Sequence, residues 1–266
     1  MNKLLVSVFD SEMAAEAGLK ALRSLHAAGD ITLYATGVVA SDAKGVVSVK
    51  KSMDPGPVGT VTGLAVGSLI GLLGGPAGIA IGALTGTLVG AVRDFWVAGV
   101  GLDFIEEAAK HLQPGKVALV AEIEEEWVVP VDAALEASGG HVLRRTRTEI
   151  AEAQFDHDIL AFKAEIKELE SEASHAGAGA LVKLQVKLAA AKHSLDGAVH
   201  RAKERGDALK QEADAKAEAL KLQLNQAQGD VKVRIEDRVK RVKSAYHARG
   251  AKLSQAWSLA KEALAA

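Results

Sequence analysis

Glycine recurs at every fourth position in two stretches of this chain, and that spacing restricts what the segment can fold into. The positions are Gly59, Gly63, Gly67 and Gly71, then Gly78, Gly82, Gly86 and Gly90. Residues four apart stack on one face of a helix, so each stretch predicts a helix with a groove that lacks side chains. Gly74-Gly75-Pro76 can end the first helix and begin the second. We therefore expect a helical hairpin over residues 56–92, a glycine zipper in which backbones approach closely.

The sequence leaves two alternatives for the surroundings of this hairpin, a lipid bilayer or a protein interior. No charged residue occurs from residue 55 to residue 92, while Lys50 and Lys51 precede this segment and Arg93 follows it. Glycine inside a helix costs about 1 kcal/mol relative to alanine in water, which also favours a bilayer. Each arm, however, spans only roughly 22–25 Å at the helical rise per residue, against a hydrocarbon core of about 30 Å. The alternative is a soluble hairpin buried in a homo-oligomer.

The segments around the hairpin predict alternating strands and helices. Ser11 is expected to cap a helix that ends near Gly29. The other helices are expected at 104–112 and 131–137, and the strands at 4–9, 31–40, 46–50, 117–123 and 141–146. The first six of these elements match the split βαβ, ferredoxin-like plan, with an extra helix–strand unit at the end. We therefore expect an α+β, ferredoxin-like domain over residues 1–147, into which the hairpin is inserted.

This part of the chain resembles a bacterial family of uncharacterised, membrane-associated proteins. The shared features are Val8-Phe9-Asp10, residues 45–50, the glycine hairpin, Leu112-Gln113-Pro114-Gly115, Trp127 and residues 139–142. The resemblance covers residues 1–147 and implies membrane association, but it implies no activity and no catalytic residues. The short apolar run of residues 4–9 does not match a signal peptide. We therefore expect the cytoplasmic side of a bacterial inner membrane, or alternatively the cytoplasm.

Residues 148–266 predict a long helical tail. They contain no proline, and alanine, leucine, lysine and glutamate dominate, with the expected breaks at residues 175–179 and, more mildly, at 229–230. An apolar stripe repeats every eleven residues, which keeps it nearly straight along a helix. A continuous helix over this stripe would be roughly 84 Å long, so we expect the stripe to meet lipid or a neighbouring subunit. Its residues are Leu209, Leu220, Leu224, Val231, Ile235, Val242, Tyr246, Leu253, Trp257 and Leu264.

Basic residues border the stripe. Residues 230–266 carry nine basic and four acidic side chains, and long cations beside an apolar stripe can reach lipid headgroups. The alternative is a helix packed on other helices, with the charged face in solvent. The bordering residues are Lys210, Lys221, Lys232, Lys243, Arg238 and Arg249.

No residue pattern in the sequence predicts a reaction. The chain has no cysteine and a net charge of −2, which argues against thiolate metal sites and nucleic-acid binding. Glu172 and His175 have the spacing of a di-metal ligand pair, but no second pair accompanies them. We therefore expect no catalytic residues, no cofactor, no metal and no small-molecule substrate. The expected function is that of a non-enzymatic, self-associating, membrane-associated protein, or alternatively of a soluble homo-oligomeric scaffold.

Overall fold

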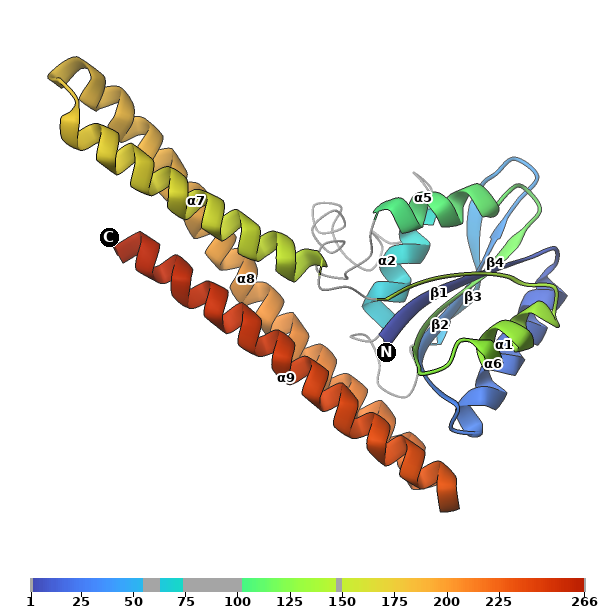
Figure 1. The fold of residues 1–266 in the computed structure, drawn as a ribbon. Helices are drawn as coiled ribbons and strands as arrows, with labels where there is room; N and C mark the ends of the chain where they lie inside the picture. The colour runs from blue at the N-terminus through green and yellow to red at the C-terminus, as the bar shows by residue number, and fades with distance from the viewer. Residues whose placement is uncertain (1, 55–62, 74–101, 147–149, 266) are drawn as a thin grey trace. The chain divides into compact units, whose positions relative to one another are not determined.

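The computed structural model describes residues 2–54, 63–73, 102–146 and 150–265 (Figure 1). The chain divides into two compact units. The first unit contains Met1–Thr148 together with Gln211–Lys243, and the second contains Glu149–Lys210 together with Ser244–Ala266. Part of the predicted tail therefore groups with the N-terminal residues.

The first unit is built on a five-stranded sheet in the order β3-β2-β4-β1-β5. The strands are β1 (Asn2–Phe9), β2 (Ile31–Ser41), β3 (Val47–Asp54), β4 (Val117–Glu125) and β5 (His141–Thr146). All neighbouring strands are antiparallel, and Val6 of β1 lies between Val120 of β4 and Leu143 of β5. The sheet and the helices around it confirm a mixed α+β fold.

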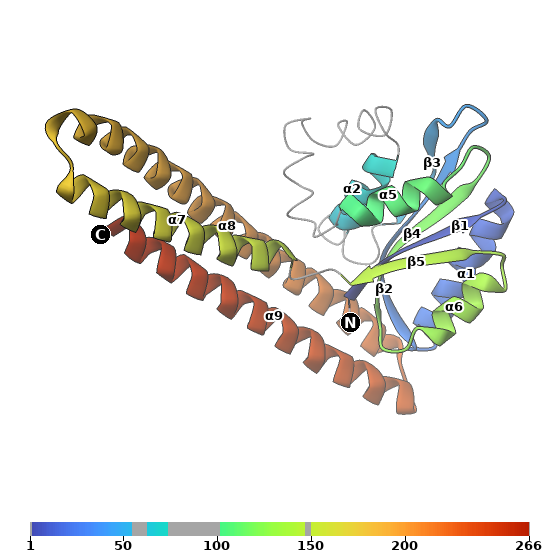
Figure 2. The same cartoon turned by 45° about the horizontal axis from the view of Figure 1, so that its top comes forward.

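Helices cover both faces of this sheet (Figures 1 and 2). On one face, α1 (Glu12–Ala27) and α6 (Val129–Glu136) bury Leu19, Leu22, Val131 and Leu135 against Leu5, Phe9 and Ile123. On the other face, α2 (Gly63–Leu73) and α5 (Leu102–His111) bury Leu69, Phe104 and Ala108 against Leu4, Val6 and Val120. Alternate residues of a strand point to opposite faces, so β1 and β4 contribute to both cores.

Local sequence signals determine where these helices and strands begin and end, as predicted. The Ser11 Oγ accepts a hydrogen bond from the Ala14 N–H at 3.2 Å, which caps the start of α1. Gly29 has φ +76° after the end of α1, a conformation that glycine adopts without steric cost. The expected strands and helices of residues 2–54 and 102–146 are all present, with ends that differ by a few residues.

The ferredoxin-like strand order is not confirmed. The expected plan would pair the third strand with the first, but β3 lies at the sheet edge and pairs only with β2 among the described strands. β4 takes the central place between β2 and β1, and all nine of its residues are buried. Residues 117–121 of β4 are apolar on both faces of the sheet, and such a run loses most buried area at an edge, which favours the central place.

Part of the predicted glycine hairpin lies in α2. Val66, Leu69, Ile70 and Leu73 are buried in the sheet core, so one face of this arm belongs to the domain's own interior. Gly67 and Gly71 are half-buried, and with Gly63 they lie roughly a third of a turn away from that face. Gly59, Gly78, Gly82, Gly86 and Gly90 lie outside the described residues.

Three long helices follow the sheet. They are α7 (Ile150–His175), α8 (Ala178–Gln226) and α9 (Gly229–Ala265), so the breaks expected near Gly177 and Gly229 are confirmed. Gly229 has φ +54°, which ends the straight course of the chain. The uninterrupted helix expected from Leu209 to Leu264 is therefore wrong, because the chain turns between α8 and α9.

The second unit has its own hydrophobic core. Ile159, Ile166 and Leu169 of α7 pack with Ala191 and Leu195 of α8, so these two helices form an antiparallel pair. Across the described parts of the chain, no helix is both long enough and apolar enough to cross a membrane.

Candidate functional site

The apolar stripe of the tail is mostly buried within the single chain. Of the residues predicted to face lipid or a neighbour, Leu209, Leu220, Ile235, Val242 and Leu253 are buried. Leu224, Val231 and Tyr246 are half-buried and Trp257 is 36% exposed, while the Leu264 side chain lies outside the described residues. The expectation that the stripe must find an outside partner is therefore wrong for its buried members, because the turn at Gly229 lets both helices pack within the chain.

Residues 211–243 form a helix pair that lies on the polar end of the sheet. The pair consists of the last part of α8 and the first part of α9, side by side in both views (Figures 1 and 2). At this end, Asn2 and Thr32 are both paired with Glu124 of β4, and Glu122 lies two residues earlier. We call residues 211–243 the docking helices and their contacts with this sheet end the docking interface.

Lys216 lies at the centre of one half of this interface. Its Nζ is 2.7 Å from Glu122 Oε1 of β4 and 2.9 Å from Glu212 Oε1 of its own helix. The Lys216 and Glu122 side chains are both fully buried. The ammonium also lies 4.8 Å from the centre of the Tyr34 ring, and Tyr34 is the extra residue where the register of β2 shifts between Leu33 and Ala35. A lysine is buried only when its charge is compensated, and here two carboxylates and a ring face supply the compensation.

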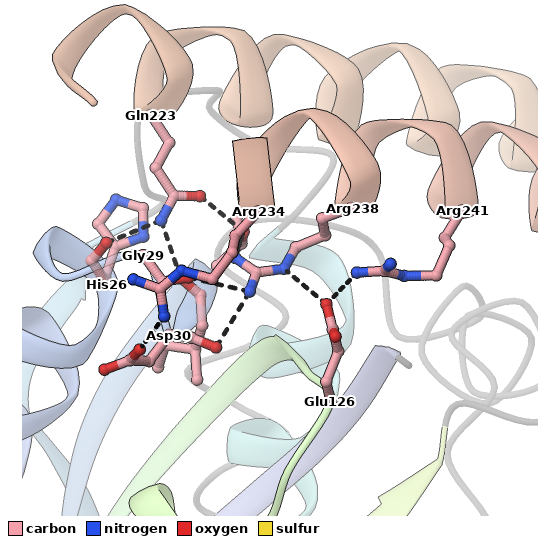
Figure 3. A network of polar contacts seen from close by, with 10 residues as sticks. His26, Gly29, Asp30, Glu126, Gln223, Arg234, Arg238 and Arg241 are labelled. Atoms are coloured by element: carbon pink, nitrogen blue, oxygen red, sulfur yellow. Dashed lines mark hydrogen bonds and ion pairs between the residues drawn. The ribbon is translucent and has the colours of Figure 1, made fainter. Parts of the chain in front are cut away.

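Thr32 of β2 joins the two docking helices in the other half. Its hydroxyl donates to Gln223 Oε1 of α8 at 2.7 Å and accepts from Arg238 Nη1 of α9 at 3.0 Å. The Gln223 amide also donates to the carbonyls of His26 and Ile31, at 2.7 and 2.8 Å. One threonine thus fixes both helices to the same strand, and most of these contacts are drawn in Figure 3.

The carbonyls that follow α1 receive two arginines from α9 (Figure 3). Arg238 donates to the carbonyls of Gly29 and Asp30, each at 3.0 Å, and Arg234 donates to Asp30 Oδ1 at 2.9 Å and the Ala28 carbonyl at 3.2 Å. The C-terminal end of a helix leaves carbonyls without helical partners and carries partial negative charge. The two arginines therefore satisfy carbonyls of the residues that follow α1 and lie at the negative end of its dipole.

Glu126 and Gly29 complete the contact with α9. Glu126, just after β4, pairs with Arg241 and lies 3.9 Å from Arg238 Nε. Gly29 approaches α9 so closely that a Cβ atom there would lie 2.4 Å from Val231 Cγ1. Burial lowers the pKa of Arg238, and the Glu126 carboxylate opposes this shift. The interface therefore combines ion pairs with a close backbone approach at one glycine.

His26 lies inside this polar contact. Its Nδ1 accepts a hydrogen bond from the Leu33 N–H at 3.2 Å, and its carbonyl accepts from Gln223. Burial, and then the positive charge of Arg238, lower the pKa of His26 below its ordinary value. A protonated Nδ1 could not accept from Leu33, so this hydrogen bond needs a neutral His26, and the lowered pKa favours that form.

The predicted basic residues divide between solvent and this interface. Lys210, Lys221, Lys232 and Lys243 are exposed and Arg249 is half-buried. Arg238 is only 3% exposed, so its expected place at the edge of a lipid-facing stripe is wrong. It lies on the stripe itself, because it comes three positions after Ile235 and four positions before Val242.

Lys216 and Gln223 were not predicted, although the sequence carries a signal for both. Lys216 comes four residues before Leu220 and Gln223 comes three residues after it, which places both on the apolar stripe. A polar residue within a buried stripe needs a polar partner, and the alternation Glu122-Ile123-Glu124 in β4 supplies one. Pairing these two patterns would have required knowing that α8 packs on the sheet, which no local pattern specifies.

The contacts of the docking interface are of the kind that hold two protein surfaces together. Its titratable side chains are held by ion pairs and hydrogen bonds between the docking helices and the sheet. Within the residues that the structure covers, no three histidine, aspartate or glutamate side chains come together as a metal site would need. Glu172 and His175, considered above for a metal pair, lie in the last turn of α7.

Comparison with known proteins gives one match. Residues 60–159 match the model of a family described as a protein of unknown function, DUF1269. This segment includes α2, α5, β4, α6, β5 and the start of α7, so it supports the expected resemblance to an uncharacterised family for that part of the chain. Neither a curated protein nor a solved structure matches the chain.

Proposed function

We propose that this chain is a non-enzymatic, self-associating protein, and that the glycine face of α2 contributes to the surface between copies. The supporting observation is that two faces of α2 differ in burial. Its aliphatic face, with Leu69 and Ile70, is buried in the sheet core, whereas Gly67 and Gly71 are only half-buried. Four-residue glycine spacing allows close backbone approach.

The substitution Gly67→Leu tests this proposal. It fills the groove without touching the buried aliphatic face, so it should lower the mass of the assembly towards the 27.7 kDa of one chain. The matched control is Lys20→Leu, which adds a leucine at an exposed position of α1. Light scattering measures both masses, and thermal unfolding shows that each variant is folded. A folded Gly67→Leu variant with the wild-type mass would remove the glycine face from the proposal.

Membrane association is a second candidate function, and two observations favour it. Trp127 is 78% exposed and Val129 is 70% exposed in the connection from β4 into α6, and tryptophan favours the headgroup region of a bilayer. The sequence also has no charged residue from residue 55 to residue 92. Under this candidate, the protein lies on the cytoplasmic side of a bacterial inner membrane.

Flotation with phosphatidylglycerol-containing vesicles tests the second candidate. Wild-type protein should float with the vesicles, and Trp127→Ser should float less, because the ring no longer enters the headgroup region. Val182→Ser is the control, since Val182 is exposed in α8 of the second unit. Recovery of wild-type protein only in the vesicle-free fraction would reject membrane association and leave the self-associating scaffold.

A further inference from the structure

We propose that the docking helices are exchangeable, and that a second copy of this chain binds them on the same end of its sheet. The inference rests on the proposed self-association and names the surface through which it occurs. Each copy would offer its residues 211–243 to the other, with Lys216 against the partner's acidic strand and Arg238 against the carbonyls after its first helix. The contacts are those seen within one chain, made between two.

The docking helices are separable from the hydrophobic cores. The two cores of the sheet contain residues between Leu4 and Leu143, and the core of the second unit contains residues between Ile159 and Val199. None of these three clusters includes a residue of 211–243. Burial of apolar area is the main stabilising contribution to a fold, and departure of the docking helices removes no member of these three clusters.

The two sides of the docking interface are complementary in charge and in hydrogen bonding. On the helices, Lys216, Arg234, Arg238 and Arg241 supply positive charge. On the sheet side, the partners are Glu122, Asp30, Glu126 and the carbonyls that follow α1. Such complementarity selects one partner over others. Residues 211–243 carry these cations at the required spacing. We therefore expect that the second segment able to bind this end of the sheet is residues 211–243 of another copy.

The connection between the two sides permits this exchange. The sheet and the docking helices are joined through residues 149–210, which belong to the second unit with its own core. The advantage of binding within one chain falls as the connection becomes longer or fits less well. At high local protein concentration, binding between copies therefore competes with binding within one chain.

Cross-linking of two single-cysteine variants tests the exchange, because the wild-type chain has no cysteine. Asp30 on the sheet side and Arg234 on α9 form a partly exposed pair at 2.9 Å. Asp30→Cys and Arg234→Cys full-length chains are mixed and treated with a short bismaleimide. A link between Cys positions on different chains gives a covalent dimer of twice 27.7 kDa. The control replaces the first variant by Met13→Cys, since Met13 is 80% exposed near the start of α1.

The expected result is a covalent dimer in the first mixture, at least several-fold more abundant than in the control mixture. A chain that carries both substitutions reports binding within one chain as a cross-linked monomer. If the double variant gives only this monomer and the mixture gives no dimer, the exchange is rejected. Light scattering of the wild type then separates the two proposals. If the wild type assembles although the mixture gives no cross-linked dimer, self-association occurs through another surface. If the wild type is a monomer at every concentration, both the exchange and the proposed self-association are rejected.

Discussion

Removing the Lys216 side chain should release the docking helices while the sheet stays folded. In Lys216→Ala, the fully buried Glu122 carboxylate loses the ammonium that lies 2.7 Å away. Breaking a buried ion pair from one side typically costs about 3–5 kcal/mol. The remaining hydrogen bonds of the docking interface contribute about 1 kcal/mol each. A loss of this size should raise the equilibrium population of the undocked state by at least about a hundredfold.

Hydrogen exchange of the backbone amides measures this release. Amides of residues 211–226 and 229–243 should exchange at least a hundredfold faster in Lys216→Ala, while the amides of β1 and β4 keep their protection. The matched control is Lys221→Ala on the same helix, because Lys221 and its partner Glu218 are both exposed and such pairs contribute about 0–1 kcal/mol. Unchanged protection of the docking helices in Lys216→Ala would refute the reasoning, and so would simultaneous loss of protection in β4.

Three further perturbations have defined outcomes. Because burial and Arg238 lower the pKa of His26 below 6.5, docking stability should be complete above that pH. It should decline as the pH falls from 6.5 towards the lower pKa of the docked state, and His26→Asn, which keeps an acceptor, should remove this slope in melting curves. Gly29→Ala should destabilise docking by more than the roughly 1 kcal/mol of a left-handed alanine, since its Cβ would lie 2.4 Å from Val231. Gly139→Ala, with φ +78° and nothing within 4 Å, should lose only that 1 kcal/mol in denaturant titration. The triple variant Lys216→Met, Glu122→Gln, Glu212→Gln should restore much of the protection lost in Lys216→Ala, because neutral side chains leave no buried charge.

Sequence patterns predicted those parts of the fold that depend on neighbouring residues. Ser11 marks the start of α1, and Gly29 and Gly139 follow helices with the left-handed conformation that glycine allows. These signals act within a few residues, so they can be recognised without knowing the tertiary structure. For the same reason, the breaks near Gly177 and Gly229 were found.

Long-range pairing was not available from the same patterns. The central place of β4 depends on which strands it pairs with, and a buried apolar strand is compatible with several orders. Arg238 was expected beside a lipid-facing stripe and Lys216 was not predicted, because their partners Thr32 and Glu122 lie far away in the sequence. The α9 half of the docking interface also depends on the turn at Gly229, whose direction no local pattern specifies.

Both proposals depend on self-association, and the solution mass of the wild-type chain measures it. Light scattering across a concentration series should give masses that rise from 27.7 kDa towards multiples of that value. The rise should shift to higher concentration in Gly67→Leu and in Lys216→Ala, which alter the two proposed association surfaces. A wild-type mass that stays at 27.7 kDa at every concentration would contradict the account.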